Sequence, residues 1–214
     1  IKMNKISDLK IEIYADGADL KSIQKLNNTS YVSGFTTNPS LMKKAQVTDY
    51  KEFALDALKI IGNKPISFEV FSDELDEMEQ QAKEIASWGN NIYVKIPITN
   101  SKGEKTFKLI KKLSENSIKC NVTAVLTQKQ VKEIYEIAKP NTDIIVSIFA
   151  GRIADTGIDP IPAMKNAIDL CKDKKKIKIL WASTREVLNI IQANNIGCHI
   201  INVPSTILEK TINI

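Results

Sequence analysis

One lysine lies in the middle of a short apolar run near the centre of the chain, residues 91–99. If this run forms a β-strand, side chains alternate between its two faces, so Lys95 shares a face with Tyr93 and Pro97. Burial of an ammonium group is costly, and desolvation lowers the pKa of a buried lysine. The result is a neutral amine that attacks a carbonyl and forms a Schiff base. The run by itself leaves a second interpretation open, in which Lys95 lies on an edge strand or extends its charged head into water.

Other apolar runs carry polar residues at the same alternating positions. The aliphatic face of each run predicts packing against helices, whereas the other face points into a shared interior together with Lys95. An isolated polar residue in a strand is commonly a hydrogen-bonded structural group. Polar side chains that several strands deliver toward one end are harder to explain in that way, and they predict a site. These residues are Glu12, Tyr14, Asp16, Ser67, Glu69, Asn121, Thr123 and Ser147, the last of which shares its face with Phe149.

The spacing of the apolar runs predicts which elements position these residues. Amphipathic helical patterns separate the runs, so that strands alternate with helices. This alternation implies right-handed parallel crossovers, and eight units of about 25 residues predict a closed (β/α)8 TIM barrel that forms one domain over residues 1–214. An open doubly wound sheet is the alternative, although no GxGxxG follows the first strand. The runs begin near Ile11, Val32, Ile66, Ile92, Ile118, Ile144, Ile177 and Cys198.

Three polar segments predict where helices begin. They are Ser72 with Asp73, residues 99–101, and Asp159 with Pro160. A TIM barrel places its active site where the strands end and run into the following loops. The polar residues near the strand ends are therefore expected to line one site.

The composition argues against several classes of function. The 214 residues carry a formal net charge of +5, but Asp173 interrupts the densest basic run, 172–178, which favours a solvated helix end over a nucleic-acid-binding patch. Three cysteines without a CxxC spacing and a single histidine, His199, predict reduced thiols in a cytoplasmic protein, with no zinc site and no Ser-His-Asp triad. No apolar run reaches about 18 residues and no charged leader precedes one, so we expect neither a membrane span nor a signal peptide.

Four motifs occur at or near strand ends: Tyr14-Ala15-Asp16, Gly34-Phe35-Thr36-Thr37-Asn38-Pro39-Ser40, Val94-Lys95-Ile96-Pro97-Ile98-Thr99 and Ser147-Ile148-Phe149-Ala150-Gly151-Arg152. With these motifs the chain resembles the transaldolase family, and most of all its short bacterial and phage-type branch, which includes fructose-6-phosphate aldolase. The similarity runs in order from about Ile11 to Pro204. It implies a (β/α)8 barrel and a class I mechanism without metal or cofactor.

The resemblance also implies roles for individual residues. Lys95 matches the lysine that forms the Schiff base, and Asp16 matches the acid–base residue near the end of the first strand. Glu69 and Thr123 match the pair that holds the catalytic water. Phe149 together with Glu69 is similar to the transaldolase pattern, whereas Tyr with Gln is similar to fructose-6-phosphate aldolase. The remaining matches concern binding, with Asn38 and Ser147 for the dihydroxyacetone hydroxyls and Arg152, Ser183 and Arg185 for phosphate.

The chemistry of a ketose phosphate supports these roles. It requires an amine that forms an iminium, a base that takes the hydroxyl proton, and cations for the phosphate. Arginine binds phosphate through two parallel hydrogen bonds, and Ser183 precedes a predicted helix whose N-terminus adds partial positive charge. Taken alone, either arginine would be explained as part of a surface ion pair.

The expected function is transfer of dihydroxyacetone between sugar phosphates of the pentose phosphate pathway, from sedoheptulose 7-phosphate or fructose 6-phosphate to glyceraldehyde 3-phosphate or erythrose 4-phosphate. The alternatives are an aldolase that releases free dihydroxyacetone and a non-catalytic sugar-phosphate-binding barrel, which has no need of Lys95. The resemblance implies a homo-oligomer, a pentamer or a decamer. Because the chain ends at Ile214, soon after the eighth predicted strand, we expect it to lack the further C-terminal helix that packs on a neighbouring subunit in relatives.

Overall fold

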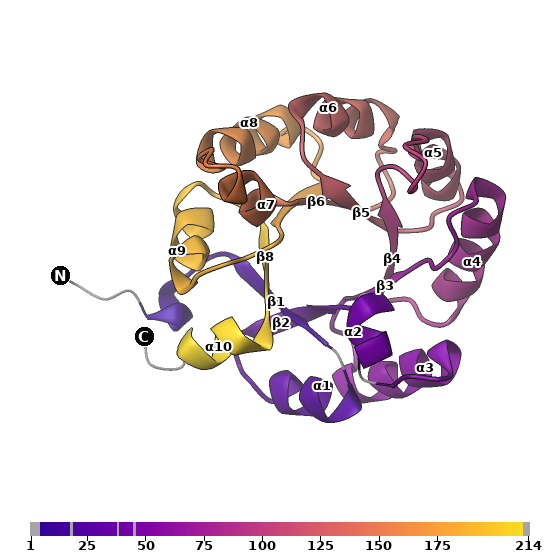
Figure 1. Cartoon of the computed structure of the whole chain (residues 1–214), viewed down its shortest axis with the longest axis horizontal. Helices are drawn as coiled ribbons and strands as arrows, with labels where there is room; N and C mark the ends of the chain where they lie inside the picture. The colour runs from indigo at the N-terminus through magenta and orange to yellow at the C-terminus, as the bar shows by residue number, and fades with distance from the viewer. Residues whose placement is uncertain (1–4, 18, 38, 45, 212–214) are drawn as a thin grey trace.

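The computed structural model describes residues 5–17, 19–37, 39–44 and 46–211, and its eight strands close into one barrel. Every neighbouring pair of strands is parallel, and the eighth strand pairs with the first to complete the ring (Figure 1). The predicted TIM barrel is confirmed, and the open doubly wound sheet is wrong. The strands are β1 (Glu12–Asp16), β2 (Val32–Thr36), β3 (Ile66–Glu69), β4 (Ile92–Pro97), β5 (Cys120–Val125), β6 (Ile144–Ile148), β7 (Ile177–Trp181) and β8 (Ile200–Val203).

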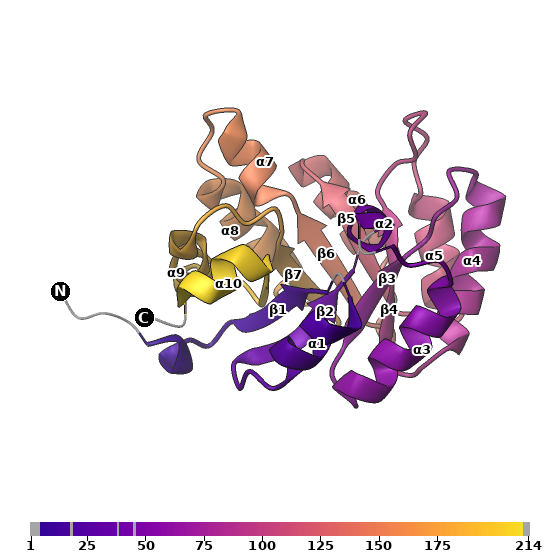
Figure 2. The same cartoon turned by 60° about the horizontal axis from the view of Figure 1, so that its bottom comes forward.

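Helices surround the barrel on the outside (Figure 1). Two short helices, α2 and α7, directly follow β2 and β6, and precede the longer α3 and α8 (Figure 2). The helical patterns in the sequence predict neither of these short helices nor α10. The helical elements are η1 (Ile6–Asp8), α1 (Leu20–Asn27), α2 (Pro39–Lys44), α3 (Tyr50–Ile61), α4 (Leu75–Ser87), α5 (Phe107–Glu115), α6 (Gln128–Ile137), α7 (Ala150–Asp155), α8 (Ile161–Cys171), α9 (Val187–Asn195) and α10 (Ser205–Thr211).

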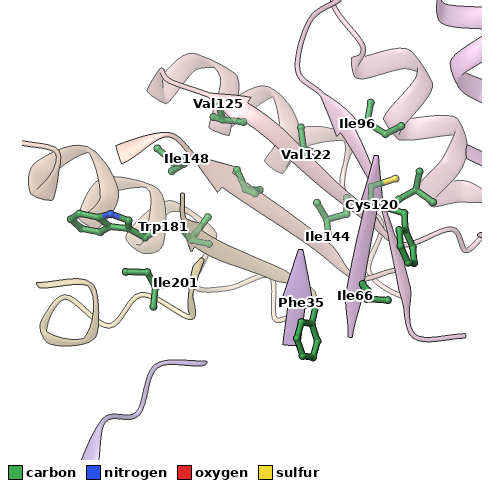
Figure 3. Close-up of a cluster of buried hydrophobic side chains, with 14 of the residues drawn as sticks. Phe35, Ile66, Ile96, Cys120, Val122, Val125, Ile144, Ile148, Trp181 and Ile201 are labelled. Atoms are coloured by element: carbon green, nitrogen blue, oxygen red, sulfur yellow. The ribbon is translucent and has the colours of Figure 1, made fainter. Parts of the chain in front are cut away.

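Alternation along the strands divides their side chains between two hydrophobic clusters. In β4, Val94 belongs to the outer cluster between strands and helices, whereas Tyr93 packs against the cluster inside the barrel. Burial of each large aliphatic side chain contributes about 1.5–3 kcal/mol, so the outer cluster holds the strands in the parity that the sequence predicts. Figure 3 shows part of it, with Phe35, Ile66, Ile96, Cys120, Val122, Val125, Ile144, Ile148, Trp181 and Ile201 contributed by successive strands.

Tyr14 fills the barrel interior instead of lining the site. Its side chain is buried against Gly34 of β2, where an added Cβ would lie 2.6 Å from the ring carbon Cε1. Burial, reinforced by the charge of Glu12, raises the pKa of the Tyr14 phenol, which therefore stays neutral. Glu12, at the other end of β1, pairs with Lys178 of β7 at 2.6 Å. Of the polar residues predicted on β1, only Asp16 lies at the carboxyl end of the strand.

One predicted helix start is wrong. The sequence predicts a helix that begins at residues 99–101, but α5 begins at Phe107. The polar side chains build a turn instead, because Asn100 Oδ1 accepts hydrogen bonds from the backbone N–H groups of Lys102 (3.1 Å) and Glu104 (2.9 Å). Short polar side chains favour helix caps and turns for the same reason, since they bond to nearby backbone groups, and here the turn is formed.

The other two predicted helix starts agree with the structure. At α8, Asp159 Oδ1 accepts a hydrogen bond from the backbone N–H of Ile161, the first helical residue, at 2.9 Å. At α4, the helix begins at Leu75, two residues after Asp73. Boundaries of this kind commonly differ by one or two residues.

The described helices and cysteines bear on two further expectations. None of the helices in the part of the chain that the structure describes is long and apolar enough to cross a membrane.

All three cysteines are free and buried. Burial raises the pKa of Cys120 and of Cys198 to about 12, and that of Cys171 to about 11. Thiols with these pKa values stay protonated near neutral pH and react slowly.

Candidate active site

A cavity of about 200 Å³ opens at the carboxyl ends of the strands. All of the residues to which the family resemblance assigns a role line it, except Glu69 and Asn38, and Asn38 lies outside the described residues. Glu12, Tyr14 and Ser67, which alternation also placed on the inner face, do not line it. A larger cavity of about 620 Å³ beside α1 and α3 contains none of the predicted site residues. The residues that line the smaller cavity are Asp16, Thr36, Lys95, Asn121, Thr123, Ser147, Phe149, Arg152, Leu180, Ala182, Ser183, Arg185 and Asn202.

Lys95 lies on an inner strand of the closed barrel, since β4 pairs with both β3 and β5. The interpretation of Lys95 as an edge-strand lysine is therefore wrong. Its side chain is only 13% exposed, and its Nζ lies 3.9 Å from Glu69 Oε2. The same Nζ donates a hydrogen bond to the backbone carbonyl of Thr37 at 3.4 Å. The amine is thus enclosed by protein while it still faces the cavity.

Glu69, the last residue of β3, is the carboxylate beside this amine. Burial raises the pKa of Glu69, and the nearby Lys95 ammonium opposes this shift without cancelling it. The backbone of Glu69 is held from behind, because the Tyr50 hydroxyl donates a hydrogen bond to its carbonyl oxygen at 2.9 Å. The Tyr50 ring packs edge-to-face against two phenylalanines, with its centroid 5.9 Å from that of Phe68 and 4.4 Å from that of Phe71. These contacts fix the end of β3 next to Lys95.

Asp16 is held by two residues, Asn202 and Thr36, that have no role predicted from the sequence. Asn202 Nδ2 donates to Asp16 Oδ1 at 2.8 Å, and the Thr36 hydroxyl lies within hydrogen-bond distance of the same oxygen. Oδ1 is therefore engaged and fixed, whereas no residue that the structure describes donates a hydrogen bond to Oδ2. Thr36 is part of one of the quoted motifs. Asn202 could have been found as a polar residue among the aliphatic residues Ile200, Ile201 and Val203 of the eighth run.

A chain of buried hydrogen bonds connects the neighbouring strands below the cavity. Ser147 Oγ donates to Asn121 Oδ1 at 2.6 Å, and Asn121 Nδ2 donates to Ser67 Oγ at 3.0 Å. Thr123 differs from these residues, because its buried Oγ1 has no hydrogen-bond partner among the described residues. A buried hydroxyl without a partner costs about 1–3 kcal/mol, so Thr123 is suited to hold a small polar ligand such as water.

The end of β6 and the start of α7 place Phe149 and Arg152 on the cavity wall. The Arg152 guanidinium carbon lies 5.9 Å from the centre of the Phe149 ring, so the ring supports the cation. Helix α7 packs closely on the segment after β7, because a Cβ added to Gly151 would lie 1.6 Å from the carbonyl oxygen of Ser183. Ser183 adopts the left-handed backbone conformation, with φ of 61°. This contact places Ser183 and Arg152 on one side of the cavity.

Arg185 lies at the outer rim of the cavity and is paired with an acidic residue that the sequence analysis does not identify. Arg185 Nη2 lies 2.6 Å from Oδ2 of Asp155, and Nε donates to Oδ1 at 3.3 Å. Arg185 thus forms an ion pair, as the alternative interpretation predicts, but it also lines the cavity. Asp155 is the last residue of α7, so the pair joins α7 to the segment before α9.

The N-terminus of α9 contributes less to the site than the sequence analysis expects. The helix begins at Val187, and Asn189 Oδ1 accepts hydrogen bonds from the backbone N–H groups of Arg185 and Glu186, both at 3.0 Å. The Glu186 side chain in turn accepts from the backbone of Asn189. These three backbone groups therefore already have partners, and the cationic side chains of the cavity are the other candidates for binding an anion.

No metal centre is formed by the side chains that the structure places. Within the described ranges, no three residues among His, Cys, Asp and Glu are grouped so that they could hold a metal ion.

The fold and the site together define the class of protein. It is a parallel TIM barrel whose cavity lies at the carboxyl ends of the strands, where enzymes of this fold carry their active sites. The chain belongs to the Transaldolase/Fructose-6-phosphate aldolase family, whose sequence profile matches residues 13–214. The predicted resemblance is thereby confirmed.

Individual relatives agree with this assignment. The chain is 32% identical over 204 residues to a protein of Nitrosopumilus maritimus named "Probable transaldolase", with 94% of this chain and 87% of the relative covered. A Clostridium kluyveri protein of the same name is 32% identical over 201 residues, with 94% and 89% covered. The family and these names indicate an enzyme of the transaldolase type.

A solved structure supports the fold alone. Thiamine phosphate pyrophosphorylase from Pyrococcus furiosus superimposes with a TM-score of 0.60, covering 92% of this chain and 86% of that protein. Its sequence is only 11% identical, so the likeness concerns the barrel and not the reaction.

Proposed function

We propose that this protein is a class I transaldolase, which transfers a dihydroxyacetone unit between sugar phosphates through a Schiff base on Lys95. The observation that carries the proposal is the position of the Lys95 amine. It is enclosed beside Glu69 on an inner strand and faces a cavity that also presents Arg152 and Arg185. A lysine in this setting serves covalent chemistry on a carbonyl, with cations at the rim for a phosphate.

The reaction begins when the Lys95 amine attacks the C2 carbonyl carbon of a ketose phosphate. The addition gives a carbinolamine, and loss of its hydroxyl group as water gives the iminium. A proton donor must assist the leaving hydroxyl, and a base must activate water when the iminium is hydrolysed at the end. Glu69 is the carboxyl group beside Nζ, and its raised pKa suits an alternating donor and acceptor. The unpartnered Thr123 hydroxyl would help to hold that water.

Cleavage follows when Asp16 takes the proton of the C4 hydroxyl. The C3–C4 bond breaks, its electron pair moves toward the iminium nitrogen, and an aldose phosphate leaves while an enamine remains on Lys95. Asn202 and Thr36 hold Asp16 in place for this step. An acceptor aldehyde then reverses the sequence, with Asp16 returning the proton to the new alkoxide.

Two further features support sugar phosphates as substrates and transfer as the outcome. Arg152 and Arg185 bring two cations to one side of the cavity, which matches a phosphate dianion. Phe149 lines the cavity with a ring that offers no hydrogen bond to water. The enamine is therefore protected from protonation and waits for an acceptor. The donors and acceptors would be those of the pentose phosphate pathway.

Borohydride trapping tests the covalent step. Fructose 6-phosphate with borohydride should add one dihydroxyacetone-derived or hexose-derived mass to Lys95, located by peptide mass spectrometry. Lys95→Ala should abolish the label and slow turnover by roughly 10⁴-fold or more, as expected for loss of a covalent nucleophile. The matched control is Lys59→Ala, since Lys59 is a surface lysine with 77% side-chain exposure. No label at all would favour the non-catalytic sugar-phosphate-binding barrel, whereas a label on another lysine would show that Lys95 is not the nucleophile.

The partition between transfer and release tests the choice of reaction. In the parent protein, product formed with erythrose 4-phosphate should greatly exceed the free dihydroxyacetone formed from fructose 6-phosphate alone. Phe149→Tyr should increase release relative to transfer, because a phenol can organise a proton donor beside the enamine. Release as fast as transfer in the parent would favour fructose-6-phosphate aldolase.

A further inference from the structure

Arg185 belongs to two cavities, and Asp155 to only one of them. Arg185 lines the site cavity of about 200 Å³ and also a neighbouring cavity of about 420 Å³ between α7 and α9. Asp155 lines the second cavity but not the first. The carboxylate therefore contacts Arg185 without lining the site cavity that contains Lys95.

The ion pair uses one edge of the guanidinium and leaves another free. Asp155 accepts from Nε at 3.3 Å and lies 2.6 Å from Nη2, so it takes the side-on edge of Arg185. A guanidinium has five N–H donors in a planar fork. No described residue accepts a hydrogen bond from the two donors on Nη1 or from the second donor on Nη2. One donor of each nitrogen forms the end-on edge, which binds phosphate through two parallel hydrogen bonds.

Both partners of the pair are fixed through their backbones. The backbone N–H of Arg185 donates to Asn189 Oδ1 at 3.0 Å, which holds the residue at the start of α9. Asp155 is the last residue of helix α7. This helix packs against the Ser183 carbonyl at Gly151, where a side chain would not fit. Because both backbones are fixed, the ion pair with Asp155 determines where the long, half-exposed side chain of Arg185 lies. Without that contact, Arg185 would be free to sample other rotamers in solvent.

We propose that Asp155 is a positioning residue for phosphate recognition, which holds Arg185 with its free edge toward the phosphate monoester of donor and acceptor sugars. The inference rests on the proposed function, in which Arg185 binds that phosphate. A second effect acts against this positioning, because the negative charge of Asp155 repels the phosphate dianion and weakens its binding. The positions of the two residues favour positioning, since Asp155 lies outside the site cavity and occupies an edge that the phosphate does not need.

The test compares phosphorylated and unphosphorylated substrates in Asp155→Asn, Asp155→Ala and Asp155→Glu. With fructose 6-phosphate and erythrose 4-phosphate, the first two variants should raise KM by roughly tenfold with kcat within about twofold of the parent, because binding before the reaction is weakened. With fructose and glyceraldehyde, KM should not change. Asp155→Glu restores the carboxylate and should recover part of the affinity. Asp56→Asn is the matched control, since it removes a surface carboxylate that pairs with Lys59 at 2.8 Å.

The double variant separates the inference from the proposed function. In an Arg185→Ala background, Asp155→Asn should have no further effect on KM, because the residue that it positions is gone. If Arg185→Ala leaves the KM for phosphorylated substrates unchanged, the phosphate site of the proposed function is wrong. If Arg185→Ala raises this KM but Asp155→Asn lowers it or leaves it unchanged, the positioning role is overturned, and a lowered KM would identify Asp155 as a competing anion.

Discussion

Glu69 and Lys95 form a pair in which burial and charge act in opposite directions. Desolvation raises the pKa of Glu69, whereas the ammonium 3.9 Å away lowers it, and the net shift is upward. Desolvation thus outweighs the ion pair at this site. A buried pair of this kind contributes little to stability. In the proposed mechanism, the pair instead holds a carboxyl group that changes its protonation state close to the Lys95 amine.

The raised pKa of Glu69 predicts how stability depends on pH. A carboxyl group whose pKa is higher in the folded than in the unfolded chain favours folding below the unfolded value, about 4.3, and this contribution is lost as pH rises through the folded pKa. In the Glu69→Gln variant, the side-chain amide cannot ionise. Its free energy of unfolding should therefore match that of the parent near pH 4 and exceed it increasingly toward pH 7.

Urea unfolding at several pH values between 4 and 7 measures this difference directly. The control is Glu52→Gln, a surface variant on α3. A gain that shrinks as pH rises would show that the charged form of Glu69 is favoured in the folded protein, contrary to the prediction.

At the residue scale, parity along a strand could be predicted from the sequence, but partners far apart in the chain could not. Alternation alone places Lys95 on the inner face of its strand, because the aliphatic residues beside it must pack on the helices. The contact between Asp16 and Asn202 joins residues 186 positions apart, and no local pattern indicates it. The pairing of Arg185 with Asp155 depends in the same way on how α7 packs against the end of β7.

The elements of the barrel follow from apolar periodicity, and the deviations occur where side chains bond locally to the backbone. The eight strands begin within two residues of the predicted starts. Helix α5 begins later than the sequence predicts, because Asn100 bonds to the backbone of its own turn. The six-residue helices α2 and α7 are too short to produce an amphipathic pattern, and tertiary packing supports them instead.

Gly151 provides a test of how helix α7 is docked. A side chain at this position would meet the Ser183 carbonyl, so Gly151→Ala must displace α7 or the segment after β7. We expect a loss of roughly 1–3 kcal/mol in the free energy of unfolding, the usual cost of overpacking. Arg152 and Asp155 both belong to α7, so KM for phosphorylated substrates should rise as well.

The matched control for the Gly151 variant is Ala154→Gly in the same helix. It lowers helix propensity by about 1 kcal/mol without adding an atom, so it separates helix stability from the contact with Ser183. Because Gly151→Ala raises helix propensity, a Gly151→Ala variant at least as stable as the parent would mean that the close contact does not limit the position of α7.

At the scale of the whole molecule, part of the positive charge is neutralised by ion pairs. In the densest basic run, 172–178, Lys176 pairs with Asp143 at 3.2 Å and Lys178 with Glu12 at 2.6 Å. These pairs support the view that the run is not a nucleic-acid-binding patch. The expected absence of nucleic-acid and membrane partners, the cytoplasmic location and the expected homo-oligomer stay predictions. Helix α10, after β8, packs against α9 and β1 of the same chain.

Closure of the barrel by β8 and β1 predicts that the whole chain unfolds as one unit. The two tryptophans report on distant parts of it, since Trp88 packs on Phe68 of β3 whereas Trp181 ends β7. Trp88→Phe and Trp181→Phe each leave one fluorescent reporter. In each variant, urea unfolding followed by fluorescence and by far-UV circular dichroism should give the same midpoint, within about 0.2 M, and the same slope. Midpoints that differ between the two signals would divide the barrel into separately folding parts and would overturn the single-domain prediction.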